Sequence, residues 1–122
     1  MPSPVTVAAV HAAPVFLDRA ATAEKAIALI REAARHGAEL IAFPETFIPA
    51  FPVWAALWAP IENHDLFVMM AEQSVSPHGA EIDALRREAK ALGVCVSMGI
   101  SESSSASVGA LWNSNILIGH DG

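Results

Sequence analysis

One carboxylate stands alone in an apolar stretch of the sequence. Glu45 is the only charged residue between Glu39 and Glu62, and aromatic side chains follow it at positions 47, 51, 54 and 58. Apolar surroundings remove water from a carboxylate, and desolvation makes it a stronger base. Glu45 is therefore the candidate for a proton-transfer role. The alternative is a surface glutamate that caps the next helical turn.

The residues before Glu45 predict a strand that ends next to it. The apolar run 40–43, Leu-Ile-Ala-Phe, is too short for a buried helix, and its length is typical of a strand covered on both faces. Pro44 follows and has no N–H to donate to a neighbouring strand. The pattern therefore places Glu45 just beyond the carboxyl end of a strand.

A strand and a helix are predicted upstream of this run. Residues 4–10 read as a buried strand, and apolar residues spaced by three and four between 22 and 36 predict an amphipathic helix. Thr22 is the expected cap at its start, and Gly37 is expected to be left-handed after its end. Strand, helix and strand form a βαβ unit with parallel strands. Ligands in such sheets bind beyond the carboxyl ends of the strands, where Glu45 is expected.

The second half of the chain predicts further elements of an α/β fold. We expect a helix over 80–92, a strand over 94–101, and an antiparallel strand over 110–118 after a serine-rich connection. Residues 53–58 predict a helical turn, and 66–73 a short helix led by Asp65. Tryptophan and methionine residues in these two segments either line a substrate pocket or pack in the core. The expected total is about four strands and two main helices.

Other candidate chemical groups are weaker. His11 follows the first strand, and we expect backbone groups to satisfy it rather than a ligand. Cys95 lies within a predicted strand with no cation nearby in the sequence, so we expect an inert core thiol rather than a nucleophile. Asp83 and Arg87 are spaced for an exposed ion pair. The remaining histidines are far apart, so neither a metal site nor a cofactor is indicated.

Composition limits the partners that the chain can have. A net charge of −6 and only seven scattered Lys and Arg residues argue against nucleic acid or an anionic membrane as a partner. The first 17 residues hold no Lys or Arg, unlike a secretory signal, and the apolar stretch 47–61 is too short and proline-rich to span a bilayer. A single cysteine suits a reducing compartment, so we predict a cytoplasmic protein. The 53% content of hydrophobic residues suggests surface meant for a partner.

The segment around Glu45 resembles a known catalytic motif. Phe-Pro-Glu-Thr-Phe-Ile-Pro at 43–49, with Phe-Pro at 51–52 and Trp54, is similar to the motif around the catalytic glutamate of nitrilases, in the carbon–nitrogen hydrolase superfamily. The resemblance extends through 12–18 upstream and through 99–102 and 111–113 downstream, and so covers essentially the whole chain. Ala50 and Phe51 stand where nitrilases usually have glycine and tyrosine. Phe51, a candidate substrate contact, keeps the ring but loses the hydroxyl.

The resemblance implies a fold and a mechanism. Residues 1–122 would be the amino-terminal part of a single domain, an αββα sandwich, with Glu45 as its catalytic glutamate. In nitrilases a cysteine attacks the nitrile carbon to give a thioimidate, the glutamate moves protons, and a lysine stabilises charge. Lys25 and Lys90 lie on predicted outer helix faces and do not match that lysine. We therefore expect this chain alone to be inactive.

The resemblance also implies partners and leaves alternatives open. The expected partners are a nitrile or amide substrate, and either further copies of the chain or a complementing carboxy-terminal segment. An amidase of the same superfamily shares the chemistry, although the residues 46–49 favour a nitrilase. A non-catalytic α/β module that binds a partner through the aromatic loop 47–58 is the alternative from a different class.

Overall fold

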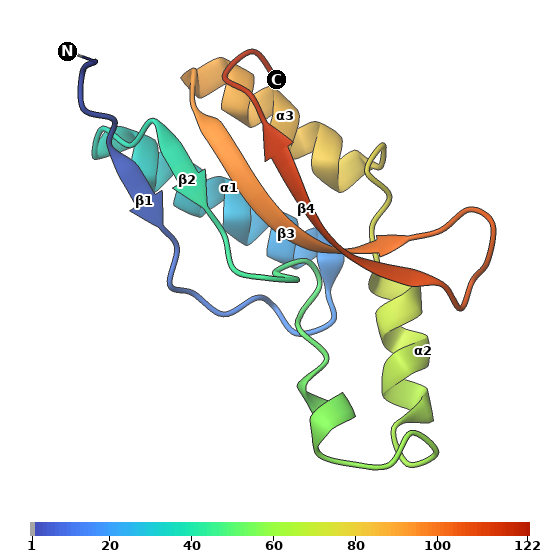
Figure 1. Ribbon diagram of the computed structural model, residues 1–122. Coiled ribbons are helices and arrows are strands. Elements are labelled where there is room, and N and C mark those ends of the chain that lie inside the picture. The colour runs from blue at the N-terminus through green and yellow to red at the C-terminus, as the bar shows by residue number, and fades with distance from the viewer. Residues whose placement is uncertain (1) are drawn as a thin grey trace.

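The fold contains one four-stranded sheet, in which the strands lie side by side in the order β1-β2-β3-β4 (Figure 1). The computed structural model describes residues 2–122, and its strands are β1 (Val7–Ala9), β2 (Leu40–Ala42), β3 (Cys95–Ser103) and β4 (Leu111–Ile118). The first three strands are parallel, and β4 is antiparallel to β3. The predicted α/β fold is confirmed. The first strand is shorter than predicted, and β3 extends two residues further because Ser103 still pairs with Leu111.

Helix α1 (Arg19–Arg35) connects β1 to β2 and completes the expected βαβ unit. Its cap differs from the prediction. The Asp18 side chain accepts a hydrogen bond from the Ala21 N–H at 2.9 Å. Thr22 lies inside the helix, where its hydroxyl donates to the Val15 carbonyl at 2.9 Å and accepts from the Val15 N–H at 3.1 Å. Thr22 therefore holds the incoming chain against the helix rather than capping it.

Helix α3 (Ala80–Leu92) has the predicted bounds and packs beside α1 (Figure 1). The Arg31 guanidinium of α1 donates two hydrogen bonds to Glu88 of α3, at 2.6 and 2.8 Å. The Arg31 hydrogen bond holds the pKa of Glu88 below its ordinary value, and burial opposes this shift. The predicted ion pair between Asp83 and Arg87 was wrong. Asp83 Oδ1 lies instead 3.7 Å from Nη1 of Arg86, three positions along the helix.

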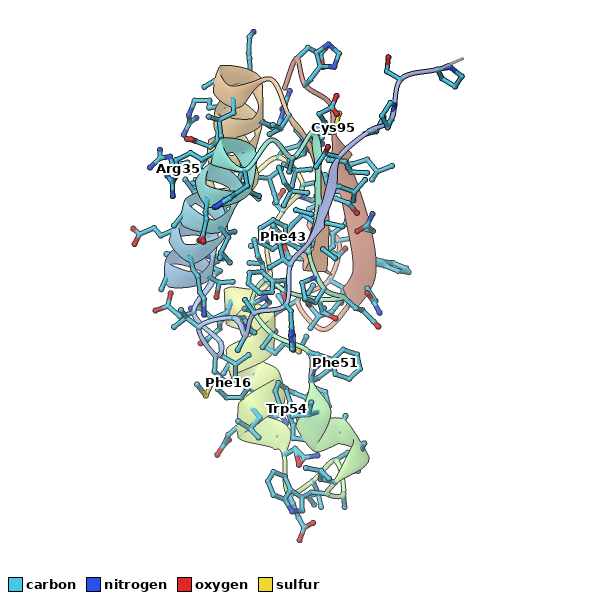
Figure 2. The ribbon with its side chains drawn as sticks, turned by 90° about the vertical axis from the view of Figure 1, so that its left-hand side faces the viewer. Phe16, Arg35, Phe43, Phe51, Trp54 and Cys95 are labelled. Carbon is cyan, nitrogen blue, oxygen red and sulfur yellow. The ribbon has the colours of Figure 1, made fainter. Side chains whose placement is uncertain are left out.

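The main core lies between these two helices and the sheet. Almost fully buried residues come from both layers, among them Ile30, Ile41, Leu85, Val96 and Ile100. Figure 2 shows α1 and α3 on one side of the sheet, while no helix or strand of residues 2–122 covers the other side. Alternation along the strands places Val7, Leu40 and Leu117 on this uncovered face. The structure is thus one sheet with one helical layer, as expected of part of an αββα sandwich.

A third helix, α2 (His64–Gln73), extends beyond the end of the sheet with the short 3₁₀ helix η1 (Val53–Ala56) (Figure 1). Helix α2 is the short helix predicted over 66–73, and it begins two residues earlier than predicted. A second apolar cluster forms here from Leu17, Ala50, Trp54 and Met70. None of the helices in residues 2–122 is long and apolar enough to cross a membrane.

Candidate active site

The segment that carries Glu45 leaves the sheet and returns to it. The Phe43 N–H donates to the Ser97 carbonyl at 2.8 Å, and pairing with β3 resumes at Ile48, whose N–H donates to the Gly99 carbonyl at 3.2 Å. Between these contacts Thr46 has a φ of 47°, in the left-handed region that few residues with a side chain adopt. Glu45 thus lies on a short bulge that β3 holds at both ends.

Gly99 allows this bulge to approach β3. A Cβ atom at position 99 would lie 2.3 Å from the Pro44 carbonyl oxygen and 2.6 Å from the Thr46 nitrogen. Both atoms belong to the backbone and cannot move aside as a flexible side chain would. Only glycine therefore fits at this position.

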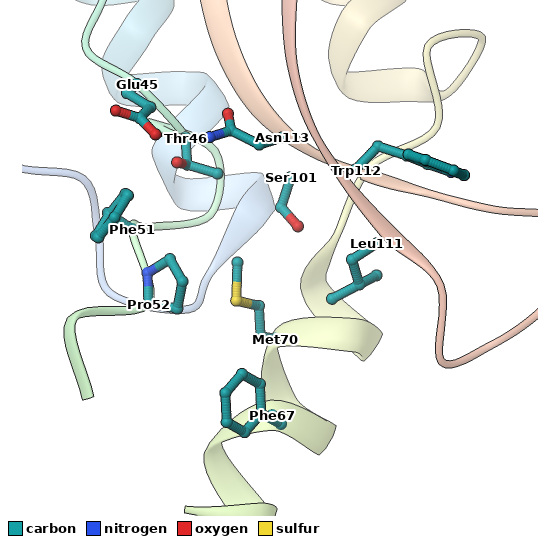
Figure 3. Close-up of a pocket in the computed structure, with 10 residues that line it drawn as sticks. All are labelled: Glu45, Thr46, Phe51, Pro52, Phe67, Met70, Ser101, Leu111, Trp112 and Asn113. Atoms are coloured by element: carbon teal, nitrogen blue, oxygen red, sulfur yellow. Dashed lines mark hydrogen bonds between the residues drawn. The ribbon is translucent and has the colours of Figure 1, made fainter. Parts of the chain in front are cut away.

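Asn113 of β4 orients the carboxylate. Its Nδ2 donates a hydrogen bond to Glu45 Oε1 at 2.6 Å (Figure 3). Asn113 is paired with Ser101 across β3 and β4, so the hairpin register delivers the amide to Glu45. A hydrogen bond to an ionised acceptor is stronger than one between neutral groups. The arrangement fixes the direction of a carboxylate that lies 68 positions earlier in the chain.

Glu45 is exposed, and the expected desolvation is not present in residues 2–122. Three of the four aromatic residues that follow it in the sequence point elsewhere. Phe47 is buried in the main core, Trp54 is buried in the second cluster, and Trp58 is exposed. The carboxylate lies instead with Asn113 on the uncovered side of the sheet, since Asn113 shares one face of β4 with the exposed Asn115 and Leu117.

A cavity of about 360 Å³ adjoins Glu45 (Figure 3). It lies between the Glu45 bulge, α2 and the start of β4, and its lining residues are Glu45, Thr46, Phe51, Pro52, Phe67, Met70, Ser101, Leu111, Trp112 and Asn113. Phe51 lines the cavity and is half exposed. Of the tryptophan and methionine residues that could either line a pocket or pack in the core, Met70 lines the cavity and Trp54 packs behind it, while Trp58 and Met69 are exposed.

The other candidate groups lie away from this cavity. Cys95 is half-buried and pairs with Leu40 at the opposite end of the strands, so it does not face Glu45. His11 is exposed. Lys25 and Lys90 are on α1 and α3, which contribute no residue to the cavity. Residues 2–122 contain no group of three or more His, Cys, Asp or Glu side chains placed to hold a metal ion.

Sequence reasoning assigned no role to Asn113, Gly99 or Thr46. All three lie within segments on which the nitrilase resemblance rests. The predicted β3–β4 hairpin also placed Asn113 near the end of the sheet that holds Glu45. These two signals together could have identified Asn113 as a contact of the carboxylate.

Comparison with known proteins places the chain in a family. Residues 6–122 match the family model for carbon–nitrogen hydrolase. The chain belongs to the carbon–nitrogen hydrolase family. The chain is 44% identical to an arylacetonitrilase of Hypocrea virens (strain Gv29-8 / FGSC 10586) over 118 residues. This match covers 97% of the chain and 34% of the arylacetonitrilase. The chain is also 44% identical over 108 residues to a nitrilase of Pseudomonas syringae pv. syringae (strain B728a), with 88% and 32% covered.

The expected nitrilase resemblance is thereby confirmed, and this carbon–nitrogen hydrolase chain spans about a third of the length of these relatives. Solved structures agree on the fold. Saccharomyces cerevisiae Nit3, a member of branch 10 of the nitrilase superfamily, superposes with a TM-score of 0.72 at 20% identity over 97% of this chain and 41% of that chain. An amidase from Nesterenkonia sp. gives 0.66 at 17% identity over 96% and 39%.

Proposed function

We propose that residues 1–122 are the amino-terminal part of a single carbon–nitrogen hydrolase domain that hydrolyses a nitrile to a carboxylic acid and ammonia. The observation that carries the proposal is the placement of Glu45. The carboxylate lies beyond the carboxyl end of a parallel strand, is oriented by Asn113, and borders a cavity. The chain around it is 44% identical to an arylacetonitrilase and to a nitrilase.

The proposed reaction needs three groups, of which this chain contributes one. A cysteine thiol adds to the nitrile carbon, forming a C–S bond, and the thiol proton passes through the glutamate to the nitrile nitrogen to give a thioimidate. Water then adds and ammonia leaves, and a second water releases the acid and restores the thiol. A lysine stabilises charge on the reacting group. Because Asn113 holds Oε1 of Glu45, Oε2 is the oxygen that accepts and returns the proton.

The lysine and the nucleophilic cysteine would come from a part of the domain outside this chain. Cys95 lies at the opposite end of the strands, and Lys25 and Lys90 lie outside the cavity. The same part would cover the open side of the sheet and remove water from Glu45. We therefore propose that this chain alone does not turn over nitriles. The complete enzyme is this chain joined to a carboxy-terminal part, from its own gene or a relative, that supplies the lysine and cysteine.

Substitution of the proton-transferring group tests the proposal. In the complete enzyme, Glu45→Gln keeps the shape and the Asn113 side of the contact but removes the base. We expect ammonia release from a nitrile to fall by about 10²- to 10⁴-fold, the usual contribution of general acid–base catalysis. Glu62→Gln, the same change at an exposed glutamate, is the matched control and should leave the rate near that of the unmodified enzyme.

Two results would contradict the proposal. If folded Glu45→Gln enzyme retained its rate, Glu45 would not be the base. If the complete enzyme hydrolysed the amide but not the corresponding nitrile, the reaction would be that of an amidase. Circular dichroism of both variants confirms that any loss of rate is not a loss of fold.

A further inference from the structure

The proposed reaction uses only the carbon and nitrogen of the nitrile group, so the rest of the substrate needs a place beside Glu45. We infer that the cavity between the Glu45 bulge, α2 and β4 binds this substituent, and that the substituent is an uncharged group containing an aromatic ring. The inference rests on the proposed function and adds the substrate class. It follows from four features of the cavity: its apolar walls, its size, the rigidity of its walls and the position of its polar groups.

The walls of the cavity are apolar. Phe67 and Met70 from α2 form one side, Leu111 from β4 forms another, and Phe51 and Pro52 close the side below Glu45 (Figure 3). No Lys, Arg or His lines the cavity, and Glu45 is its one charged group. A negatively charged substituent would therefore find no cation on the walls that this chain supplies, away from the reacting nitrile group. An uncharged apolar substituent gains from leaving water at these walls.

The size of the cavity selects a ring over a short alkyl group. Its volume is about 360 Å³. An apolar cavity of roughly 150 Å³ is enough to hold benzene, and small-molecule sites run from roughly 300 Å³ upward. The space therefore accepts a ring and a short linker. A methyl or ethyl group would leave most of the walls without a contact, and the lost contacts lower affinity.

Packing behind the cavity holds its walls in place. Trp54 is buried and meets Phe67 edge to face, with ring centroids 5.8 Å apart and planes at 74°. Phe16 packs on Trp54 in the same way at 5.8 Å and 89°. Met70 is also buried, and its carbonyl accepts hydrogen bonds from the Ser74 N–H and hydroxyl. Walls fixed in advance avoid the entropy cost of ordering on binding.

Glu45, Thr46 and Asn113 lie together at one end of the cavity (Figure 3). Thr46 is buried, and its hydroxyl has no hydrogen-bond partner among residues 2–122. The Glu45 carboxylate and the Asn113 amide lie at the same end of the cavity and are hydrogen-bonded to each other. Thr46 lies next to Glu45, whereas Phe67 and Met70 lie at the opposite end (Figure 3). This polarity directs the reacting nitrile toward Glu45 and the ring toward α2.

The test compares two nitriles in the complete enzyme. Phenylacetonitrile carries a ring and propionitrile does not, and ammonia release gives kcat/KM for each. We expect the unmodified enzyme to prefer phenylacetonitrile. Met70→Phe fills the cavity and should lower the ratio of the two kcat/KM values by about tenfold or more, within the range for altered hydrophobic substrate pockets. The ratio does not depend on the fraction of active enzyme, because both substrates meet the same preparation.

Two further variants complete the design. Met69→Phe makes the same change one position earlier, on an exposed side chain outside the cavity, and should leave the ratio unchanged. Leu111→Phe fills the cavity from β4 and should lower the ratio as Met70→Phe does. If Met70→Phe does not fold, Leu111→Phe serves as the test of the cavity. Nitrile hydrolysis without a ring preference, or with a ratio that neither cavity variant moves, would overturn this inference and leave the proposed function standing. Hydrolysis of neither nitrile would overturn both.

Discussion

At the scale of single residues, orientation and burial of the carboxylate have separate causes. Asn113 fixes the direction of Glu45 through a 2.6 Å hydrogen bond within this chain. The same carboxylate is exposed, since nothing in residues 2–122 covers its side of the sheet. A carboxylate that is aimed but still hydrated is set for proton transfer once a cover removes its water. In the proposed function, this chain would supply the geometry of the base, and the part that packs on the sheet would desolvate it.

The Asn113 contact gives a prediction at this scale. In the complete enzyme, Asn113→Ala should lower kcat by roughly 10- to 150-fold with little change in KM, because hydrogen bonds to charged groups contribute about 1.5–3 kcal/mol. Asn115→Ala is the matched control. Asn115 lies two residues further along the same face of β4 and contacts Ser97 rather than Glu45. Steady-state kinetics on both variants decides, and equal losses in the two would argue against a specific role for Asn113.

At the scale of elements, the site depends on how closely two backbone segments approach. The Pro44–Thr46 bulge lies directly over Gly99 of β3, with no room for a Cβ atom. The bulge is held by pairing before and after it, at Phe43 and Ile48. A side chain at position 99 would push the bulge, and with it Glu45, away from Asn113. Strand β3 therefore positions the Glu45 carboxylate through its backbone, at Gly99 and at the hydrogen bonds to Phe43 and Ile48.

Gly99→Ala tests this close approach. We expect it to destabilise the protein by about 1–3 kcal/mol, as overpacking of a well-packed interior does, and also to lower activity. Gly109→Ala is the control, because a Cβ at position 109 meets nothing within 4 Å. Urea-induced unfolding measures both changes. A Gly99→Ala variant as stable and active as Gly109→Ala would show that the bulge adjusts at no cost.

At the scale of the whole molecule, the sheet has one covered and one open face (Figure 2). Val7 and Leu117, both on the open face, keep 55% and 77% of their surface exposed. An apolar face of this kind favours association with another chain or segment. The face that would receive such a cover is also the side on which Glu45 lies, so we propose that assembly and activity are linked.

The open face predicts self-association of the isolated chain. We expect sedimentation velocity to show larger species as the protein concentration rises, and Leu117→Lys to weaken this association by roughly tenfold or more, because a charge would be buried in an apolar contact. Val108→Lys is the control, since Val108 is at least as exposed as Leu117 but lies in the β3–β4 connection. Equal effects of both substitutions would place the contact elsewhere on the surface.

The sequence by itself determined the order of the elements and the place of Glu45 beyond β2. These features depend on neighbours in the chain: apolar spacing marks α1 and α3, and Gly37 and Gly93 end them in left-handed conformations. Such local signals survive in a single sequence because they need no knowledge of distant contacts. The Asp18 cap was missed because Thr22, the predicted cap, instead bonds the backbone of Val15.

Only the tertiary structure decided what surrounds the carboxylate. The Asn113 hydrogen bond depends on the register of the β3–β4 hairpin, and the cavity depends on how α2 packs against the start of β4. Adjacent aromatic residues did not bury Glu45, since Phe47 and Trp54 turn into two separate cores. Burial is a property of what lies across space from a side chain. Periodicity along the chain predicts which face of an element is apolar, but not which surface that face meets.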